Sequence, residues 1–131
     1  MNQETEEKVL LFENDPTVLE KIDQAFLNRN HKVIRFSTRD EALDALKGAS
    51  FDLLLVGLGA EEVDPIEVLR TFVMASPMSS VITITDLSDD EIHEKAEGYG
   101  ILGNIPRDVP SEQLFALLDT HEKIHQSLRK D

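Results

Sequence analysis

The chain has 131 residues, which suits one domain, and 40% of them are hydrophobic, enough for a packed core. It has no cysteine, which excludes a disulfide scaffold, a thiolate zinc site and a cysteine nucleophile. The net charge of −13 disfavours nucleic-acid binding, and no apolar run approaches the roughly 20 residues of a membrane span. The polar, acidic N-terminus is unlike a signal peptide. We therefore expect a cytoplasmic protein with neither a nucleic-acid nor a membrane partner.

Short apolar runs recur along the chain and predict five strands. The first and third runs are continuously apolar, as in strands buried on both faces of a sheet. The second run alternates and predicts a strand nearer an edge. The expected strands are residues 9–12, 33–36, 51–56, 81–85 and 101–105.

Each of these runs is followed by apolar residues at helical spacing. Two of the helices open with an Asp-Pro pair and two with a capping-box pattern, which are typical helix starts. The expected helix starts are Asp15, Ser37, Asp64, Ser88 and Ser111. This alternation predicts an α/β fold of three layers, with a doubly wound (βα)5 parallel sheet covered by helices on both faces.

The carboxyl ends of the strands are where such folds place their chemistry. Topology alone therefore selects a small set of residues that follow the first, third, fourth and fifth strands. They are Glu13, Asn14, Asp15, Gly57, Thr85 and Ile105.

Several motifs occur in an order and at a spacing that match one known family. The first strand ends in Leu11-Phe-Glu-Asn-Asp15, and the third region reads Phe51-Asp-Leu-Leu-Leu-Val-Gly-Leu58 before the helix that follows Asp64-Pro65. Thr85 and the Ile105-Pro106 pair follow at the ends of the fourth and fifth strands. Over residues 8–122 this pattern resembles the receiver domain of two-component response regulators. The resemblance implies a flavodoxin-like (CheY-like) fold, strand order 2-1-3-4-5 and a role in phosphorelay signal transduction.

The departures from the family lie at its chemical positions. Gly57 stands at the position of the phosphoacceptor aspartate, Ile105 at that of the phosphoryl-contacting lysine, and Asn14 replaces a magnesium ligand of the acidic pair. Leu102 stands where many receivers have an aromatic residue. Magnesium prefers carboxylate oxygens and phosphoryl transfer needs cations. We therefore expect weak or absent magnesium binding, no metal site, no cofactor and no catalytic residue.

Other candidate sites have simpler interpretations. Asp52 is expected at the wrong end of the sheet, Asp64 as a helix cap and Asp86 in a turn, so none suits a substitute phosphoacceptor. Arg107 could partly replace the missing lysine, but its position beyond Pro106 argues against this. His121 and His125 are four residues apart and could bind a metal, but without an evident third ligand we expect surface or interface histidines.

The leading hypothesis is a degenerate receiver, not an enzyme, that acts by phosphorylation-independent protein–protein interaction. The alternative is a sensing domain whose vacated pocket, around Gly57 and Thr85, admits a small molecule or ion. The expected partner is another protein or a covalently linked output domain. The candidate interaction face comprises Asp89, Asp90, Glu94, Leu102, Leu114 and Leu118.

The expected organisation has three parts. Residues 1–7 are predicted to be a disordered tail, and residues 8–122 the receiver-like domain. Residues 123–131 extend the last helix and would serve as a linker or as the contact of a homodimer.

Overall fold

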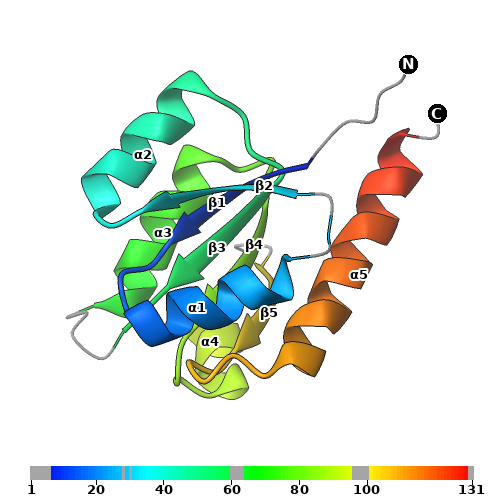
Figure 1. Cartoon of the computed structure of the whole chain (residues 1–131). Coiled ribbons are helices and arrows are strands. Elements are labelled where there is room, and N and C mark those ends of the chain that lie inside the picture. Colours follow the sequence, from blue (N-terminus) through cyan, green and yellow to red (C-terminus); the bar gives the residue numbers. More distant parts are fainter. Residues whose placement is uncertain (1–6, 28, 30, 60–63, 96–100, 130–131) are drawn as a thin grey trace.

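The computed structural model of the chain describes residues 7–27, 29, 31–59, 64–95 and 101–129 (Figure 1). Strands and helices alternate throughout these residues. The strands are β1 Glu7–Phe12, β2 His31–Phe36, β3 Leu53–Gly57, β4 Ser80–Ile84 and β5 Ile101–Ile105. The helices are α1 Pro16–Ala25, α2 Arg39–Gly48, α3 Pro65–Ala75, α4 Asp89–Lys95 and α5 Ser111–Arg129.

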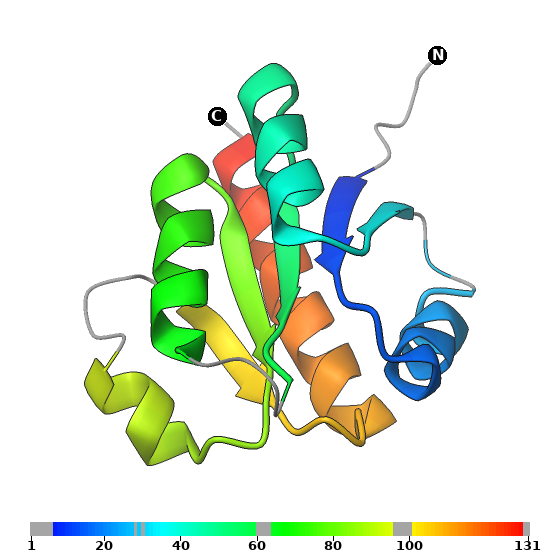
Figure 2. The ribbon, with the colours of Figure 1, turned by 90° about the vertical axis from the view of Figure 1, so that its left-hand side faces the viewer.

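The strands form one parallel sheet in the order β2-β1-β3-β4-β5. Helices cover both faces, with α1 and α5 on one side and α2 and α3 on the other (Figures 1 and 2). The predicted three-layer (βα)5 fold, its strand order and the edge position of the second strand are confirmed.

The central strand β3 supplies apolar side chains to both sides of the sheet. Leu53 and Leu55 belong to the core under α1 and α5, while Leu54 and Val56 belong to the core under α2 and α3. This division follows from the two-residue period of a strand. Burying one such leucine or valine side chain completely stabilises the fold by about 1.5–3 kcal/mol.

The two Asp-Pro pairs begin helices as predicted. Asp15 accepts a hydrogen bond from the backbone N–H of Thr17 at 2.9 Å, and Asp64 accepts one from that of Glu67 at 3.2 Å. In both helices proline follows the capping residue, where its missing N–H costs nothing. These caps also fix where the loops after β1 and β3 end.

Of the two predicted capping boxes, one is confirmed and one is displaced. Ser88 and Glu91 exchange hydrogen bonds at the start of α4, at 3.0 and 3.1 Å. The capping residue of α2 is Thr38 and not Ser37, because the Thr38 hydroxyl accepts the N–H of Glu41 at 3.2 Å. Both residues can cap a helix, so the sequence pattern left the register open by one residue.

The start of β1 corrects two expectations. Glu7, assigned to the disordered tail, is the first residue of β1 and is buried. Its Oε1 lies 3.1 Å from Nε2 of His31 and 3.3 Å from Nε2 of His121. His121 is thus a buried residue joining α5 to the sheet, not the surface or interface histidine we expected, and the side chain of His125 lies outside the described residues.

Two further observations concern the described part of the chain as a whole. No group of three or more histidine, cysteine or acidic side chains in this part is arranged to hold a metal ion. Over the same residues, no helix has the length and apolar character needed to cross a bilayer.

Candidate functional site

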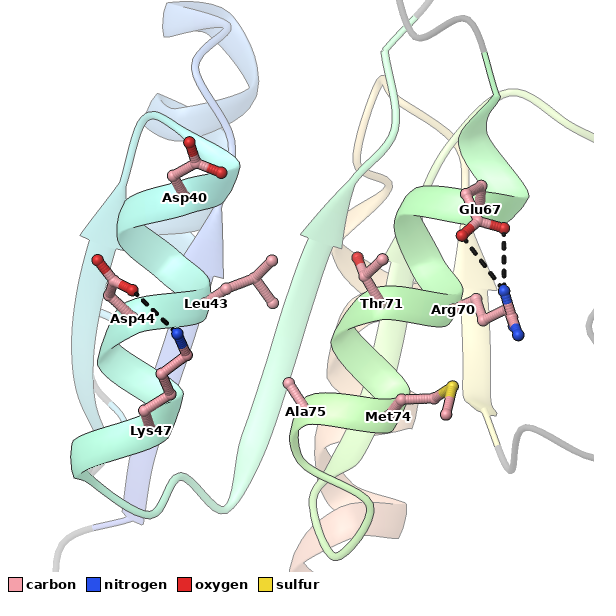
Figure 3. A pocket seen from close by; sticks show the side chains of 9 residues that line it. All are labelled: Asp40, Leu43, Asp44, Lys47, Glu67, Arg70, Thr71, Met74 and Ala75. Carbon is pink, nitrogen blue, oxygen red and sulfur yellow. Dashed lines mark hydrogen bonds and ion pairs between the residues drawn. The ribbon is translucent and has the colours of Figure 1, made fainter.

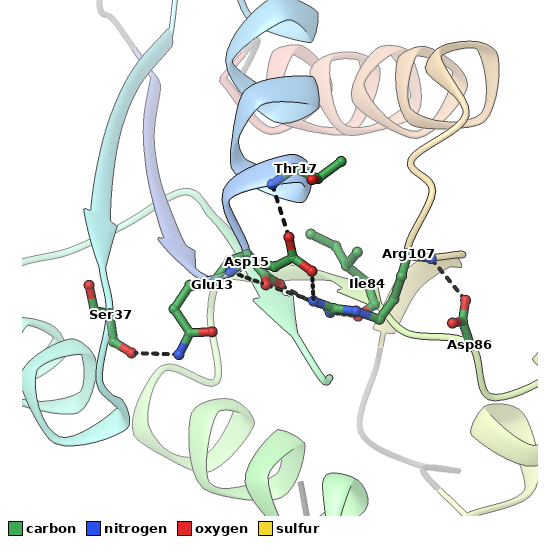
Figure 4. Close-up of polar contacts among 8 residues, drawn as sticks. Glu13, Asp15, Thr17, Ser37, Ile84, Asp86 and Arg107 are labelled. Carbon is green, nitrogen blue, oxygen red and sulfur yellow. Dashed lines mark hydrogen bonds and ion pairs between the residues drawn. The ribbon is translucent and has the colours of Figure 1, made fainter. Parts of the chain in front are cut away.

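The loops at the carboxyl edge of the sheet bring three residues together from different parts of the chain. Glu13 follows β1, Gly57 ends β3, and Arg107 lies two residues after the end of β5. Parallel strands end at the same edge, so residues far apart in sequence meet there. Figure 4 shows the polar contacts at this edge.

The centre of the site is an ion pair between Glu13 and Arg107. Nη2 of Arg107 donates to Oε2 of Glu13 at 2.7 Å, and Nη1 donates to Oε1 at 3.1 Å (Figure 4). The two side chains are only 3% and 16% exposed. Two parallel N–H···O bonds between a guanidinium and a carboxylate form a strong, directional contact.

Arg107 is also held by the strand and loop beside it. Its Nη1 donates to the carbonyl oxygen of Ile84 at 3.1 Å, and its backbone N–H donates to Oδ1 of Asp86 at 3.1 Å. The first contact anchors the guanidinium to the end of β4, and the second anchors the backbone to the β4–α4 loop. Arg107 therefore connects the residue after β1, the end of β4 and the β4–α4 loop.

The remaining acidic groups support this arrangement. Oε2 of Glu13 accepts the backbone N–H of Asp15 at 2.9 Å, and Oδ2 of Asp15 lies 4.0 Å from Nη2 of Arg107. Burial alone would lower the pKa of Arg107, but the hydrogen bond and charge of Glu13, aided by Asp15 and Asp86, raise it above its ordinary value. The site thus holds a permanent cation among three carboxylates.

Gly57 leaves the space that Glu13 occupies. A Cβ atom at position 57 would lie 1.8 Å from Oε1 of Glu13 and 2.9 Å from the carbonyl oxygen of Phe12. Real Cβ atoms essentially never approach other atoms that closely. Any side chain at position 57 would displace the carboxylate of Glu13, and the ion pair depends on glycine at this position.

Of the six residues selected from topology, Glu13 and Asp15 lie beside the guanidinium of Arg107, and Gly57 lies against Glu13. The other three have different roles. Asn14 is exposed, and its Nδ2 donates to the carbonyl oxygen of Ser37 at 3.4 Å. Ile105 is fully buried in the core beneath α1 and α5. The hydroxyl oxygen of Thr85, also buried, accepts the N–H of Leu87 at 3.3 Å.

Arg107 is the site residue that sequence reasoning set aside. Its position beyond Pro106 argued against a role, yet the chain turns there, with the N–H of Val109 bonded to the carbonyl oxygen of Pro106 at 3.0 Å. The usable signal was Glu13 itself, since a carboxylate at a buried sheet edge needs a paired cation. Gly57 was a second signal, because it makes room for that carboxylate.

The prediction that three leucines lie on the candidate interaction face is wrong. Leu114 and Leu118 are fully buried in the core, and Leu102 is half-buried against it. Leu114 and Leu118 are one turn apart and pack on the sheet, so they offer no surface to a partner. The exposed large apolar side chains on the described part of α5 are Phe115 and Ile124.

The acidic residues assigned to that face lie on α4. Asp90 and Glu94 are exposed on this helix. Asp89 is the first residue of α4, and its side chain lies outside the described residues. Of the predicted face, Asp90 and Glu94 are therefore the residues whose side chains the structure places on the surface.

The sequence of the chain is similar to known proteins. The model of the response regulator receiver domain family matches residues 9–119. The chain is 21% identical over 123 residues to the cell cycle response regulator CtrA of Brucella ovis, a match that covers 94% of this chain and 50% of that relative. The chain thus spans about half the length of the curated relatives it matches.

Solved structures show the same fold. The signal receiver domain of an HD domain-containing protein from Pseudomonas fluorescens Pf-5 has a TM-score of 0.79 at 18% identity, over 99% of this chain and 97% of that one. A CheY-like response regulator receiver domain protein from Methanospirillum hungatei JF-1 has a TM-score of 0.74 at 20% identity, over 91% and 98%. With the family match over most of its length, the chain belongs to the response regulator receiver domain family.

Proposed function

We propose that this chain is a degenerate receiver that acts in two-component signal transduction through protein–protein contacts, without being phosphorylated and without enzymatic activity. The observation that supports this proposal most directly is the ion pair between Glu13 and Arg107, which fills the site. The family match supports the coarser role in signalling.

In this proposal, the site lacks both the acceptor carboxylate and the free magnesium ligands that phosphorylation requires. If Gly57 stands at the acceptor position, the nucleophilic carboxylate is missing, and a side chain there would collide with Glu13. Magnesium needs carboxylate oxygens, but both oxygens of Glu13 already accept from Arg107. Phosphoryl transfer depends on such a metal to neutralise developing charge. We therefore expect weak or no magnesium binding and no cofactor.

The alternative, a sensing site for a small molecule or ion, is less favoured by the packing. The space above Gly57 is filled by the Glu13 carboxylate, and a Cβ at Gly59 would lie 3.7 Å from the guanidinium of Arg107. A ligand would have to displace this buried pair before binding. The pair costs more to break than a solvent-exposed one, because the carboxylate left behind is desolvated.

The proposed partner is a protein or a linked output domain in the cytoplasm. We place its contact on the exposed acids of α4, Asp90 and Glu94, which suit a basic surface. A homodimer through α5 is a second proposal, supported by the exposed side chains of Phe115 and Ile124 and by the continuation of the helix to Arg129.

An amide NMR titration with magnesium and then with beryllofluoride, a mimic of aspartyl phosphate, tests the silent site. We expect no shift at Glu13, Gly57 or Arg107 in the natural chain. The variant Arg107→Ala is the matched control, because it frees the oxygens of Glu13 and should give weak magnesium shifts confined to Glu13 and Asp15. Saturable shifts in the natural chain would contradict the proposal and favour the sensing alternative.

A further inference from the structure

The face of the sheet that α2 and α3 cover carries an open groove between these two helices. It has a volume of about 730 Å³ and lies on the far side of the sheet from α1 and α5 (Figures 2 and 3). Volumes of this size are typical of sites that hold a ligand or an anchoring side chain. The groove is separate from the Glu13–Arg107 site, and none of the residues of that site lines it.

The walls of the groove offer apolar contact surface. Leu43 of α2 and Thr71 of α3 are half-buried, and Met74 is 66% exposed. The hydroxyl of Thr71 donates to the carbonyl oxygen of Val68 at 2.6 Å, so its polar atom is already satisfied within the helix. Methionine adapts to irregular partners because its side chain is flexible and polarisable.

The rims of the groove carry three carboxylates and two cations, Lys47 and Arg70, and among the described residues no ion pair joins the two helices across it. Among the described residues, Asp40 makes no ion pair, and Asp44 pairs with Lys47 at 3.6 Å within α2. Glu67 likewise pairs within its own helix, with Arg70 at 3.3 Å (Figure 3). Such exposed pairs are weak, about 0.3–0.5 kcal/mol each. The carboxylates therefore remain able to accept cations from a partner.

The length of the groove limits what fits it. It runs from Asp40 to Lys47 along α2 and from Glu67 to Ala75 along α3. At 1.5 Å per residue this corresponds to about 11 Å, or two turns of a helix. Two neighbouring helices present a valley in which a third helix can lie, with apolar side chains pointing into the valley.

We propose that the α2–α3 groove binds a short amphipathic basic helix of a partner protein. Its apolar side chains would contact Leu43 and Met74, and its lysines or arginines would meet the carboxylates of Asp40 and Glu67. The net charge of −13 steers such a segment towards the domain. A contact this small belongs to the weak, transient class of interfaces, so we expect an affinity of about micromolar or weaker.

The probe is a peptide of about 12 residues, made of leucine and lysine with the leucines on one helical face. The control peptide has the same composition in an order that scatters the leucines. The chain has three methionines, so methyl-¹³C-methionine labelling gives three NMR probes. We expect the Met74 methyl signal to shift saturably with the ordered peptide, and the scattered peptide to bind at least about 10-fold more weakly.

Two matched variants test the location. Thr71→Arg inserts a bulky cation into the groove, and Thr120→Arg makes the same change on α5. Both threonines are bonded through their hydroxyls to a helix carbonyl, Thr120 to that of Ala116 at 3.0 Å. We expect Thr71→Arg to weaken binding at least about 10-fold and Thr120→Arg by less than about 2-fold.

A third variant, Asp40→Lys, changes an exposed position and leaves the packed wall intact. It should weaken the ordered peptide even if Thr71→Arg disturbs the fold, which the dispersion of the amide spectrum would reveal. Equal binding of the two peptides would overturn the proposal and indicate attraction by net charge alone. A Met74 signal that stays unchanged while amide signals of α4 or α5 shift would also overturn the proposal, because the peptide would then bind at one of those helices.

Discussion

The ion pair between Glu13 and Arg107 makes a quantitative prediction about stability. In the variant Arg107→Met, the side chain still covers the site but donates none of its hydrogen bonds. The carboxylate of Glu13, 3% exposed, would then keep only the backbone N–H of Asp15. Removing one partner of a buried pair costs about 3–5 kcal/mol, and we expect about 3 kcal/mol because that backbone N–H remains.

The double variant Glu13→Gln/Arg107→Met tests the physical cause of this loss. Glutamine keeps the shape of glutamate without its charge, so no buried carboxylate is left unpaired. We expect the summed losses of unfolding free energy in the two single variants to exceed the loss in the double variant by about 2 kcal/mol. Urea unfolding followed by circular dichroism measures all four free energies of unfolding. An interaction free energy below about 0.5 kcal/mol would refute the view that Arg107 holds the carboxylate.

The interaction free energy between Glu13 and Arg107 has a defined pH dependence. Burial tends to lower the pKa of Arg107, but Glu13 raises it, and the net shift is upward. A cation with a higher pKa in the folded state contributes its stability below the unfolded pKa and loses it only as pH rises through the folded pKa. Because the pKa of arginine in the unfolded chain already lies far above this range and the folded pKa of Arg107 is higher still, the interaction free energy should be constant from about pH 7 to 10. A decrease in that range would mean that another cation holds Glu13.

Three further substitutions test the packing, each by urea unfolding. Gly57→Ala should cost about 2–3 kcal/mol because its Cβ would lie 1.8 Å from Oε1 of Glu13, and the cost should fall when Glu13 is also replaced by alanine. Gly103→Ala should cost about 1 kcal/mol, because the atom it meets at 2.6 Å is a methyl group of Leu117, which can move. Leu118→Ala should cost about 2–5 kcal/mol, since Leu118 is fully buried, and a cost below about 0.5 kcal/mol would contradict its place in the core.

The fold could be predicted because local signals agreed with the tertiary arrangement. The Asp-Pro pairs begin the helices that follow β1 and β3, and the run at β3 is apolar because both faces of that strand are covered. Boundaries were less accurate, as at Thr38, because two neighbouring residues can both cap a helix. His121 was misassigned because its burial depends on Glu7, a residue more than 100 positions away in sequence.

The site was predicted in position but not in chemistry. Topology selects the residues after each strand, yet which of them face the centre depends on side-chain reach and on local turns. Asn14 and Ile105 were selected by position and point elsewhere. Arg107 was set aside by position and reaches the centre, because the long guanidinium side chain spans from the loop after β5 back to Glu13.

The contacts of Arg107 suggest how the site could still take part in signalling. The guanidinium binds Glu13 at the end of β1, and the backbone of the same residue binds Asp86 in the loop that leads to α4. A partner that moves α4 would therefore pull on Asp86 and, through Arg107, on the buried carboxylate. Breaking that pair is costly, so the domain should resist such movement and present α4 in one position. In the proposed function, the internal cation holds the loop in place, and partner binding does not require a phosphoryl group.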